Sequence, residues 1–188
     1  GGMTVSRCMS HPRVLVSVCI DRGETPGAAL LVVRTGPKRG ARFELDRRSF
    51  GSGETQDTIM RSIAERIPRN ATVLSHTRRM PDHALRHSVS PHRLLRPYPP
   101  GLVARYRPDL VTVCLPCGQR ELAAAAAAYK IVAERDPMWT MLEARAARDA
   151  QALWLTFLWT RCRQTQRLWL ASAWEAWRAI ERARKAPI

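Results

Sequence analysis

The sequence predicts an α/β domain with a mixed central sheet flanked by helices and a helical extension at the C-terminal end. Three short apolar runs come first, at residues 13–20, 28–34 and 41–45. Apolar residues at helical spacing follow at 54–67, then another short run at 71–75 and a long helical stretch from 141 onward. A length of 188 residues suits one domain with an appendage, and a hydrophobic content of 45% excludes a disordered chain. We therefore expect one domain over 3–160 and a basic amphipathic helix over 161–188.

Three strands open the predicted domain. Residues 13–20 are β-branched and nearly all apolar, which is typical of a strand buried on both faces. Turn residues at 21–27 and at 36–40 separate this strand from the next two, at 28–34 and 41–45. This order predicts a meander of neighbouring strands.

A helix and a fourth strand come next. Ile59, Ile63 and Ile67 fall on one helical face, and the helix ends before Pro68 because proline cannot continue it. Residues 71–75 then return to the short apolar run of a strand.

The rest of the chain is mostly helical. Residues 110–114 predict a further strand or a buried turn, and six consecutive alanines within 119–132 favour a tightly packed helix. A break in the last helical stretch is expected near 161–166. Five tryptophans at helical intervals are more typical of a core or an interface than of a ligand cage: Trp154, Trp159, Trp169, Trp174 and Trp177. We expect the last helix to cap the domain or to dock a protein partner.

The charge balance favours a polyanionic partner. Lys and Arg number 31 against 16 Asp and Glu, a formal net charge of +15, which is typical of proteins that bind nucleic acid or an anionic membrane surface. Nearly all of these bases are arginine, and a genome rich in G and C would give the same bias without selection for binding. The longest apolar run, 122–129, is too short to span a bilayer, so we expect a cytoplasmic protein with no membrane partner.

The segment 69–107 is the most basic part of the chain. It carries eight arginines and four histidines, with Tyr98 and Tyr106 among them and Asp82 as its one acid. Such a segment grips a phosphate backbone through its cations and stacks a base on an aromatic ring. The alternative is a solvated loop.

Four acids stand out by their positions. Asp21 and Glu24 follow the first strand, Asp82 follows the fourth, and Asp149 lies inside an alanine-rich helix. Carboxylates that meet in this way hold two divalent ions about 3.5–4 Å apart, which stabilise the attacking and leaving oxygens of a phosphodiester displacement. Alternatively, each acid is a solvated or ion-paired residue in an arginine-rich protein.

In their order and context these segments resemble the DEDD superfamily of 3′→5′ exonucleases, which have a ribonuclease-H-like fold. Residues 21–27 resemble its D-x-E-T-T-G motif, residues 73–82 its second motif and residues 144–150 its third, so that the resemblance runs from about residue 14 to 158. It implies metal-dependent 3′→5′ hydrolysis of nucleic acid, with Mg²⁺ or Mn²⁺ held by Asp21, Glu24, Asp82 and Asp149. It also implies contact with a single strand or a 3′ end, for which we expect Thr25, His76, Arg78, Arg79, Arg93, Arg96 and Tyr98.

The chain departs from this family at three places. One extra residue stands between Asp21 and Glu24, and one between His76 and Asp82. The third motif has Ala144 in place of the histidine of one branch and Arg145 in place of the tyrosine of the other. Because the usual general base is missing, we expect slow hydrolysis, or a substitute base among His76, His83, His87 and His92. The alternative is an inactive nuclease-fold protein that binds nucleic acid or acts as an adaptor.

The five cysteines are irregularly spaced, which favours reduced thiols over a disulfide framework. Cys114 and Cys117 have the spacing of a redox dithiol next to a helix start. A chance pair is the competing interpretation, since a thioredoxin-type motif is expected directly after the first strand of a strand–helix–strand unit.

Overall fold

A mixed sheet forms the centre of the computed structural model, which describes residues 8–21, 26–79, 95–98, 106–133 and 141–185. Its strands are β1 (Val14–Asp21), β2 (Gly27–Thr35), β3 (Ala41–Ser49), β4 (Thr72–Arg79), β5 (Leu95–Tyr98) and β6 (Val111–Leu115). The helices are α1 (Gln56–Arg66), α4 (Gln119–Ala128), α5 (Met141–Arg161) and α6 (Gln164–Lys185). The predicted α/β class, with helices flanking a mixed sheet, is confirmed.

The strands lie in the order β3-β2-β1-β4-β5, and β6 also pairs with β4. β1, β2 and β3 form the predicted antiparallel meander, in which Asp21 pairs with Gly27 and Thr35 with Ala41. The chain then passes through α1 before it enters β4, and this crossover makes β4 parallel to β1. β6 is parallel to β4, whereas β5 pairs with the far end of β4 in the antiparallel sense.

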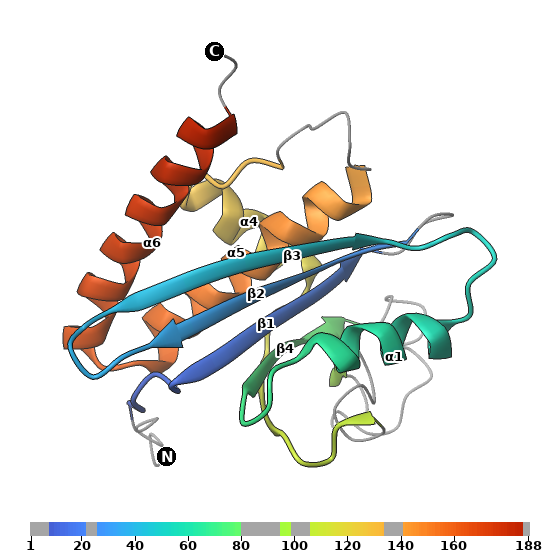
Figure 1. Ribbon diagram of the computed structural model, residues 1–188, viewed down its shortest axis with the longest axis horizontal. Helices are drawn as coiled ribbons and strands as arrows, with labels where there is room; N and C mark the ends of the chain where they lie inside the picture. Colours follow the sequence, from blue (N-terminus) through green and yellow to red (C-terminus); the bar gives the residue numbers. More distant parts are fainter. Residues whose placement is uncertain (1–7, 22–25, 80–94, 99–105, 134–140, 186–188) are drawn as a thin grey trace.

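Side chains of β1 alternate between two separate cores. Val16, Val18 and Ile20 pack in the core that contains α1. Leu15 and Cys19 pack in the core that contains α5 and α6. Figure 1 shows α1 on one face of the sheet and α4, α5 and α6 on the other. Because successive residues of a strand point to opposite faces, Asp21 lies on the α5 face.

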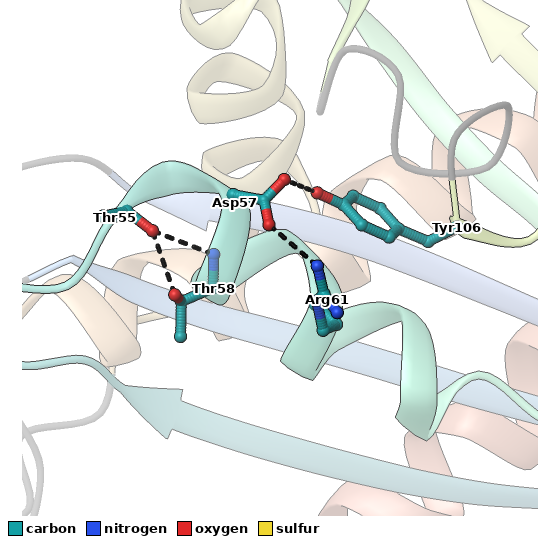
Figure 2. A network of polar contacts seen from close by, with 5 residues as sticks. All are labelled: Thr55, Asp57, Thr58, Arg61 and Tyr106. Atoms are coloured by element: carbon teal, nitrogen blue, oxygen red, sulfur yellow. Dashed lines mark hydrogen bonds and ion pairs between the residues drawn. The ribbon is translucent and has the colours of Figure 1, made fainter.

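The first turn of α1 is fixed by a polar network (Figure 2). The hydroxyl of Thr55 caps the helix by accepting a hydrogen bond from the backbone N–H of Thr58, 3.2 Å away. Asp57 accepts hydrogen bonds from Arg61, at 3.1 Å, and from the hydroxyl of Tyr106. Since Tyr106 precedes β6, this network holds the entry to β6 against α1.

Tryptophans at the C-terminal end form a core between α5, α6 and β3. Trp154 is fully buried, and its ring meets the edge of Phe43 with 5.3 Å between centroids. Trp177 stacks on Phe43 with 5.6 Å between centroids, and Trp174 is also buried. The core interpretation is thus confirmed for Trp154 and Trp174. None of the described helices has the length and apolar character that crossing a membrane requires.

The segment before β1 is attached to the joint between α5 and α6. The backbone N–H of Met9 donates to the carbonyl of Arg161 at 2.8 Å, and that of His11 donates to Oε1 of Gln166 at 2.9 Å. The indole of Trp154 donates to the His11 ring. Residues 9–11 are therefore held against the end of α5 and the start of α6.

Several elements differ in length from their prediction. β3 and β4 extend to Ser49 and Arg79, each four residues beyond the predicted end. β3 is an edge strand and the end of β4 is polar, so neither extension belongs to an apolar run in the sequence. The alanine helix ends at Ala128, four residues early, and Lys130 follows with a left-handed φ of 54°. β5 lies within the segment predicted to be mostly loop.

Candidate acidic site

The C-terminal end of β1 places Asp21 under the first turn of α5. Asp21 is 7% exposed and pairs across the ladder with Gly27. A Cβ on Gly27 would lie 2.6 Å from the carbonyl carbon of Leu142 and 2.9 Å from Cα of Glu143. Only a glycine admits such close contact with helix backbone. Gly27 thus allows the start of α5 to lie directly on the sheet beside Asp21.

From this contact α5 crosses the sheet and carries Asp149 over β1. The hydroxyl of Ser17 donates a 2.7 Å hydrogen bond to the carbonyl of Ala150, which fixes the middle of α5 against the strand. Asp149 is 5% exposed. It lies near enough to Asp21 for the negative charge of Asp21 to raise the pKa of Asp149. Two of the four predicted acids are therefore buried on the same face of the sheet.

Cys19 lies two residues before Asp21 on β1, and its pKa responds to the same charged residues. Burial raises the pKa of its thiol well above the ordinary value, and the negative charge of Asp149 raises it further. Asp21 acts in the same direction and Arg148 in the opposite one. The Cys19 thiol is thus neutral and lies on the same face of the sheet as Asp21.

Arg148 is the cation that contacts the acid pair directly. Its Nε donates a 2.9 Å hydrogen bond to Oδ1 of Asp149. Burial is the main cause that raises the pKa of Asp149, and the hydrogen bond from Arg148 opposes it. Arg145, one turn earlier on α5, also lowers the pKa of Asp149 through its charge. Arg148 gave no separate signal in the sequence, because an arginine next to an acid is common on helices.

His76 belongs to the same face of the sheet. Leu74 packs in the core that contains α5, so the alternation along β4 turns His76 to that side too. The His76 side chain is buried, and its backbone pairs with Leu115 of β6 and Tyr98 of β5. His76 is thus on the strand next to Asp21, beyond the last paired residues of β1 and β4, Ser17 and Leu74.

Glu143 is a further buried acid that sequence reasoning missed. It lies in the first turn of α5, above Gly27, and is 5% exposed. Acids are common in the first turn of a helix because they favour its positive end, so the residue gave no separate signal.

Other predicted residues are described only in part or not at all. Glu24, Thr25, Asp82 and Arg93 lie outside the described residues. Arg78 and Arg79 belong to β4 and Arg96 and Tyr98 to β5, where the ladder pairs Arg78 with Arg96 and His76 with Tyr98. The two strands therefore align basic and aromatic residues of the segment 69–107 in register.

Divalent cations suit the chemistry of the acid pair. Mg²⁺ is commonly held by one or two carboxylates together with water, and two buried carboxylates that repel each other gain from a cation between them. Among the described residues, no group of three or more His, Cys, Asp or Glu side chains is arranged to hold a metal. Asp21 and Asp149 are the two predicted ligands that the structure describes, and Glu24 and Asp82 lie outside the described residues.

The cysteines give no support to redox chemistry. All five are free. Burial raises the pKa of Cys117 to about 11, and the negative charge of Glu121 acts in the same direction. Reactive dithiols need a lowered thiol pKa, so the environment of Cys117 disfavours the redox interpretation.

Comparison of the chain with protein-family models, with curated proteins and with solved structures finds no match.

Proposed function

We propose that this protein is a cytoplasmic, metal-dependent 3′→5′ exonuclease with a ribonuclease-H-like fold of the DEDD type. One observation carries the proposal: Asp21 at the end of β1 and Asp149 on α5 are both buried on one face of the sheet and act on each other electrostatically. These are the first and last acids of the motif order that resembles the family. The mixed sheet supports the proposal, as does the net charge of +15, which suits a nucleic-acid substrate.

In this proposal, Asp21 and Asp149 hold Mg²⁺ or Mn²⁺, and the resemblance adds Glu24 and Asp82. A divalent ion bound there would stabilise the attacking and leaving oxygens of a phosphodiester. The chain itself supplies orientation: Ser17 and Gly27 fix α5 so that Asp149 stays opposite Asp21. Arg145, which is exposed beside the acids, attracts the phosphate backbone.

In this scheme His76 acts as the general base that accepts a proton from the attacking water. It is the described histidine of the segment 69–107, and its strand neighbours that of Asp21. A positioned general base contributes roughly 10²–10⁴-fold to rate, so activity without the family's histidine or tyrosine depends on this substitute.

A second candidate function is binding of nucleic acid without cleavage. The ion pair between Arg148 and Asp149 favours it, because a guanidinium already neutralises one of the proposed metal ligands. In that case the basic strands β4 and β5 hold the nucleic acid. The exposed last turns of α6 then offer a surface to a protein partner.

Digestion of a 5′-labelled single strand separates the two functions. We expect shortening from the 3′ end with Mg²⁺ or Mn²⁺ and none with EDTA. Asp21→Asn and Asp149→Asn should each lower the rate at least about 100-fold, since even partners outside a ligand shell are worth 10–100-fold. Asp109→Asn is the matched control, because Asp109 is an exposed acid paired with Arg107 away from the site.

Retention of the labelled strand without shortening in any metal would instead establish the binding function. Full cleavage by Asp149→Asn would place the active centre elsewhere. DNA and RNA strands of one sequence, tested side by side, also give the sugar preference.

A further inference from the structure

The turn that joins β2 to β3 carries a group of uncompensated positive charges. Residues 34–42 contain four basic residues and no acid: Arg34, Lys38, Arg39 and Arg42. Arg13 lies beside them, because its carbonyl accepts a 2.9 Å hydrogen bond from the N–H of Thr35. All five side chains are exposed, and none forms an ion pair with an acid in the part of the chain that the structure describes. We call these five residues the hairpin cluster.

Arg34 and Arg42 lie directly opposite each other on neighbouring strands. Both belong to the α1 face of the sheet, since their neighbours Val33 and Phe43 pack in the core on the α5 face. The Cβ atoms of directly opposite residues are about 4.5–5.5 Å apart, and like charges in such a pair destabilise a sheet. The fold therefore keeps a repulsion that an acid at either position would remove.

Elsewhere on the same face of β3, basic side chains are neutralised. Asp46 accepts a 2.8 Å hydrogen bond from Arg66 of α1, and its other carboxylate oxygen lies 3.8 Å from Arg48. Glu44, between Asp46 and Arg42, is exposed and forms no ion pair with any described residue. β3 thus carries paired charges beside α1 and unpaired cations beside the turn.

Protection of the sheet edge does not account for the whole cluster. Basic residues on an edge strand prevent pairing with another chain, and Arg42 lies on the edge strand β3. Arg34, however, lies on β2, which has β1 and β3 on its two sides. Its unpaired charge therefore has no such role.

We propose that the hairpin cluster binds the phosphate backbone of nucleic acid and forms a contact surface separate from the acidic site. Arg34 pairs with Val14 at the start of β1, whereas Asp21 ends this strand of eight residues. A strand of that length spans roughly 23 Å. Figure 1 shows the turn between β2 and β3 at the end of the sheet where β1 begins. The cluster and Asp21 therefore lie at opposite ends of β1.

The chemistry of the cluster suits nucleic acid better than an anionic membrane. Guanidinium groups bind phosphate oxygens through paired hydrogen bonds, and several neighbouring cations gain affinity by releasing counterions from a polyanion. Proteins that lie on a membrane surface also insert apolar side chains into it. None of the large apolar side chains that the structure shows exposed belongs to 34–42. Because phosphate contacts carry no sequence information, we expect binding that does not depend on base sequence.

The inference shares the nucleic-acid partner with the proposed function but does not depend on cleavage. Binding to the full chain is therefore measured in EDTA, by fluorescence anisotropy of a labelled single-stranded DNA and of an RNA of the same sequence. Each titration is repeated at several salt concentrations. Vesicles that contain phosphatidylserine serve as the membrane probe.

Arg42→Glu is the decisive variant, because its expected effects on stability and on binding differ in sign. An acid at position 42 faces Arg34 and replaces repulsion with attraction, so the melting temperature should not fall. Affinity for the labelled strands should fall at least about fivefold at about 0.1 M salt, and the slope of log affinity against log salt should decrease by about one. Loss of structure cannot explain weaker binding by an equally stable chain.

Arg66→Gln is the matched control, and Arg39→Asn is a second test. Arg66→Gln removes one positive charge from the same face of the sheet, but one that Asp46 already neutralises, so affinity should change less than about twofold. Arg39 has a φ of 53°, a conformation that asparagine adopts more readily. Arg39→Asn thus removes a charge without strain, and we expect affinity to fall about fivefold.

Unchanged affinity and salt slope in both Arg42→Glu and Arg39→Asn would overturn the inference. An equal loss in Arg66→Gln would do the same, because net charge alone would then explain binding. Tighter binding to the vesicles than to either nucleic acid would assign the cluster to a membrane surface instead. None of these results decides whether Asp21 and Asp149 support cleavage, which is measured separately with Mg²⁺ or Mn²⁺.

Discussion

The indole N–H of Trp154 donates a hydrogen bond to Nε2 of His11 over 3.0 Å. Nδ1 of the same ring lies 2.7 Å from the carbonyl oxygen of Pro12, so Nδ1 carries the proton and Nε2 is the acceptor. A second proton on Nε2 would point at the Trp154 N–H. Burial lowers the pKa of His11 to about 4, which keeps the ring neutral.

This arrangement predicts that stability falls in mild acid. The pKa of His11 is about 4 in the folded protein against an ordinary value of 6.5, so between these values the unfolded chain takes up a proton that the folded one does not. The free energy of unfolding should therefore be unaffected above pH 7 and should drop by about 2–3 kcal/mol between pH 7 and 4.5. Urea unfolding at several pH values measures it.

His11→Gln is the control for this pH dependence. The variant is less stable at pH 7.5, but its stability lacks the contribution of a titrating ring, so the difference from the original chain should shrink by about the same 2–3 kcal/mol at pH 4.5. The other histidines are common to both chains and cancel. A difference independent of pH would contradict the role given to His11.

Gly27→Ala should separate α5 from the sheet. The new Cβ would meet the backbone of Leu142 and Glu143, which cannot turn aside as a flexible side chain can. Overpacking of this kind costs about 1–3 kcal/mol or more. Gly40→Ala is the matched control, since no atom lies within 4 Å of its added Cβ and the change should be nearly neutral. Thermal and urea unfolding compare the two, and equal effects would refute the close packing of α5.

Trp154→Phe should destabilise the core much more than Trp159→Phe. Trp154 is fully buried and holds His11, whereas Trp159, on the same helix, is 38% exposed. The first change leaves Nε2 of His11 without its donor and empties part of the indole volume, a loss of about 2–4 kcal/mol. The second should cost less than about 1 kcal/mol. Urea unfolding at pH 7.5 gives both values, and similar losses would contradict the assignment of the core.

Periodicity predicted the elements well where burial is complete. β1 and β2 are apolar on both faces because each core takes alternate residues, and both were found within a residue of their ends. β5 was missed because Leu95–Tyr98 contains an arginine and a proline and pairs only with the end of β4. A single short strand of this kind has no recognisable hydrophobic pattern, because only its pairing with β4 makes it a strand.

The sequence predicted only those residues of the candidate site that follow a recognisable strand or lie on a recognisable helix. Asp21 follows a buried strand and Asp149 lies among alanines that pack on the sheet, so both positions were visible in the sequence. Arg148 was not selected, because only the three-dimensional structure shows that its side chain turns toward Asp149. The contact of His11 with Trp154 spans 143 residues, and no local pattern encodes such a pair.

Met9 and His11 contact Cys162 and Gln166, which are synthesised about 150 residues later. The order of synthesis therefore matters for folding. The meander is synthesised before α5 and α6, and Leu31, Val33 and Phe43 then lack the cover that Trp154 and Trp174 later provide. Until α5 and α6 have been synthesised, the nascent chain therefore exposes an apolar sheet face. Exposed apolar surfaces of this kind bind chaperones or aggregate. This face of the sheet is covered only after α5 and α6 have been synthesised.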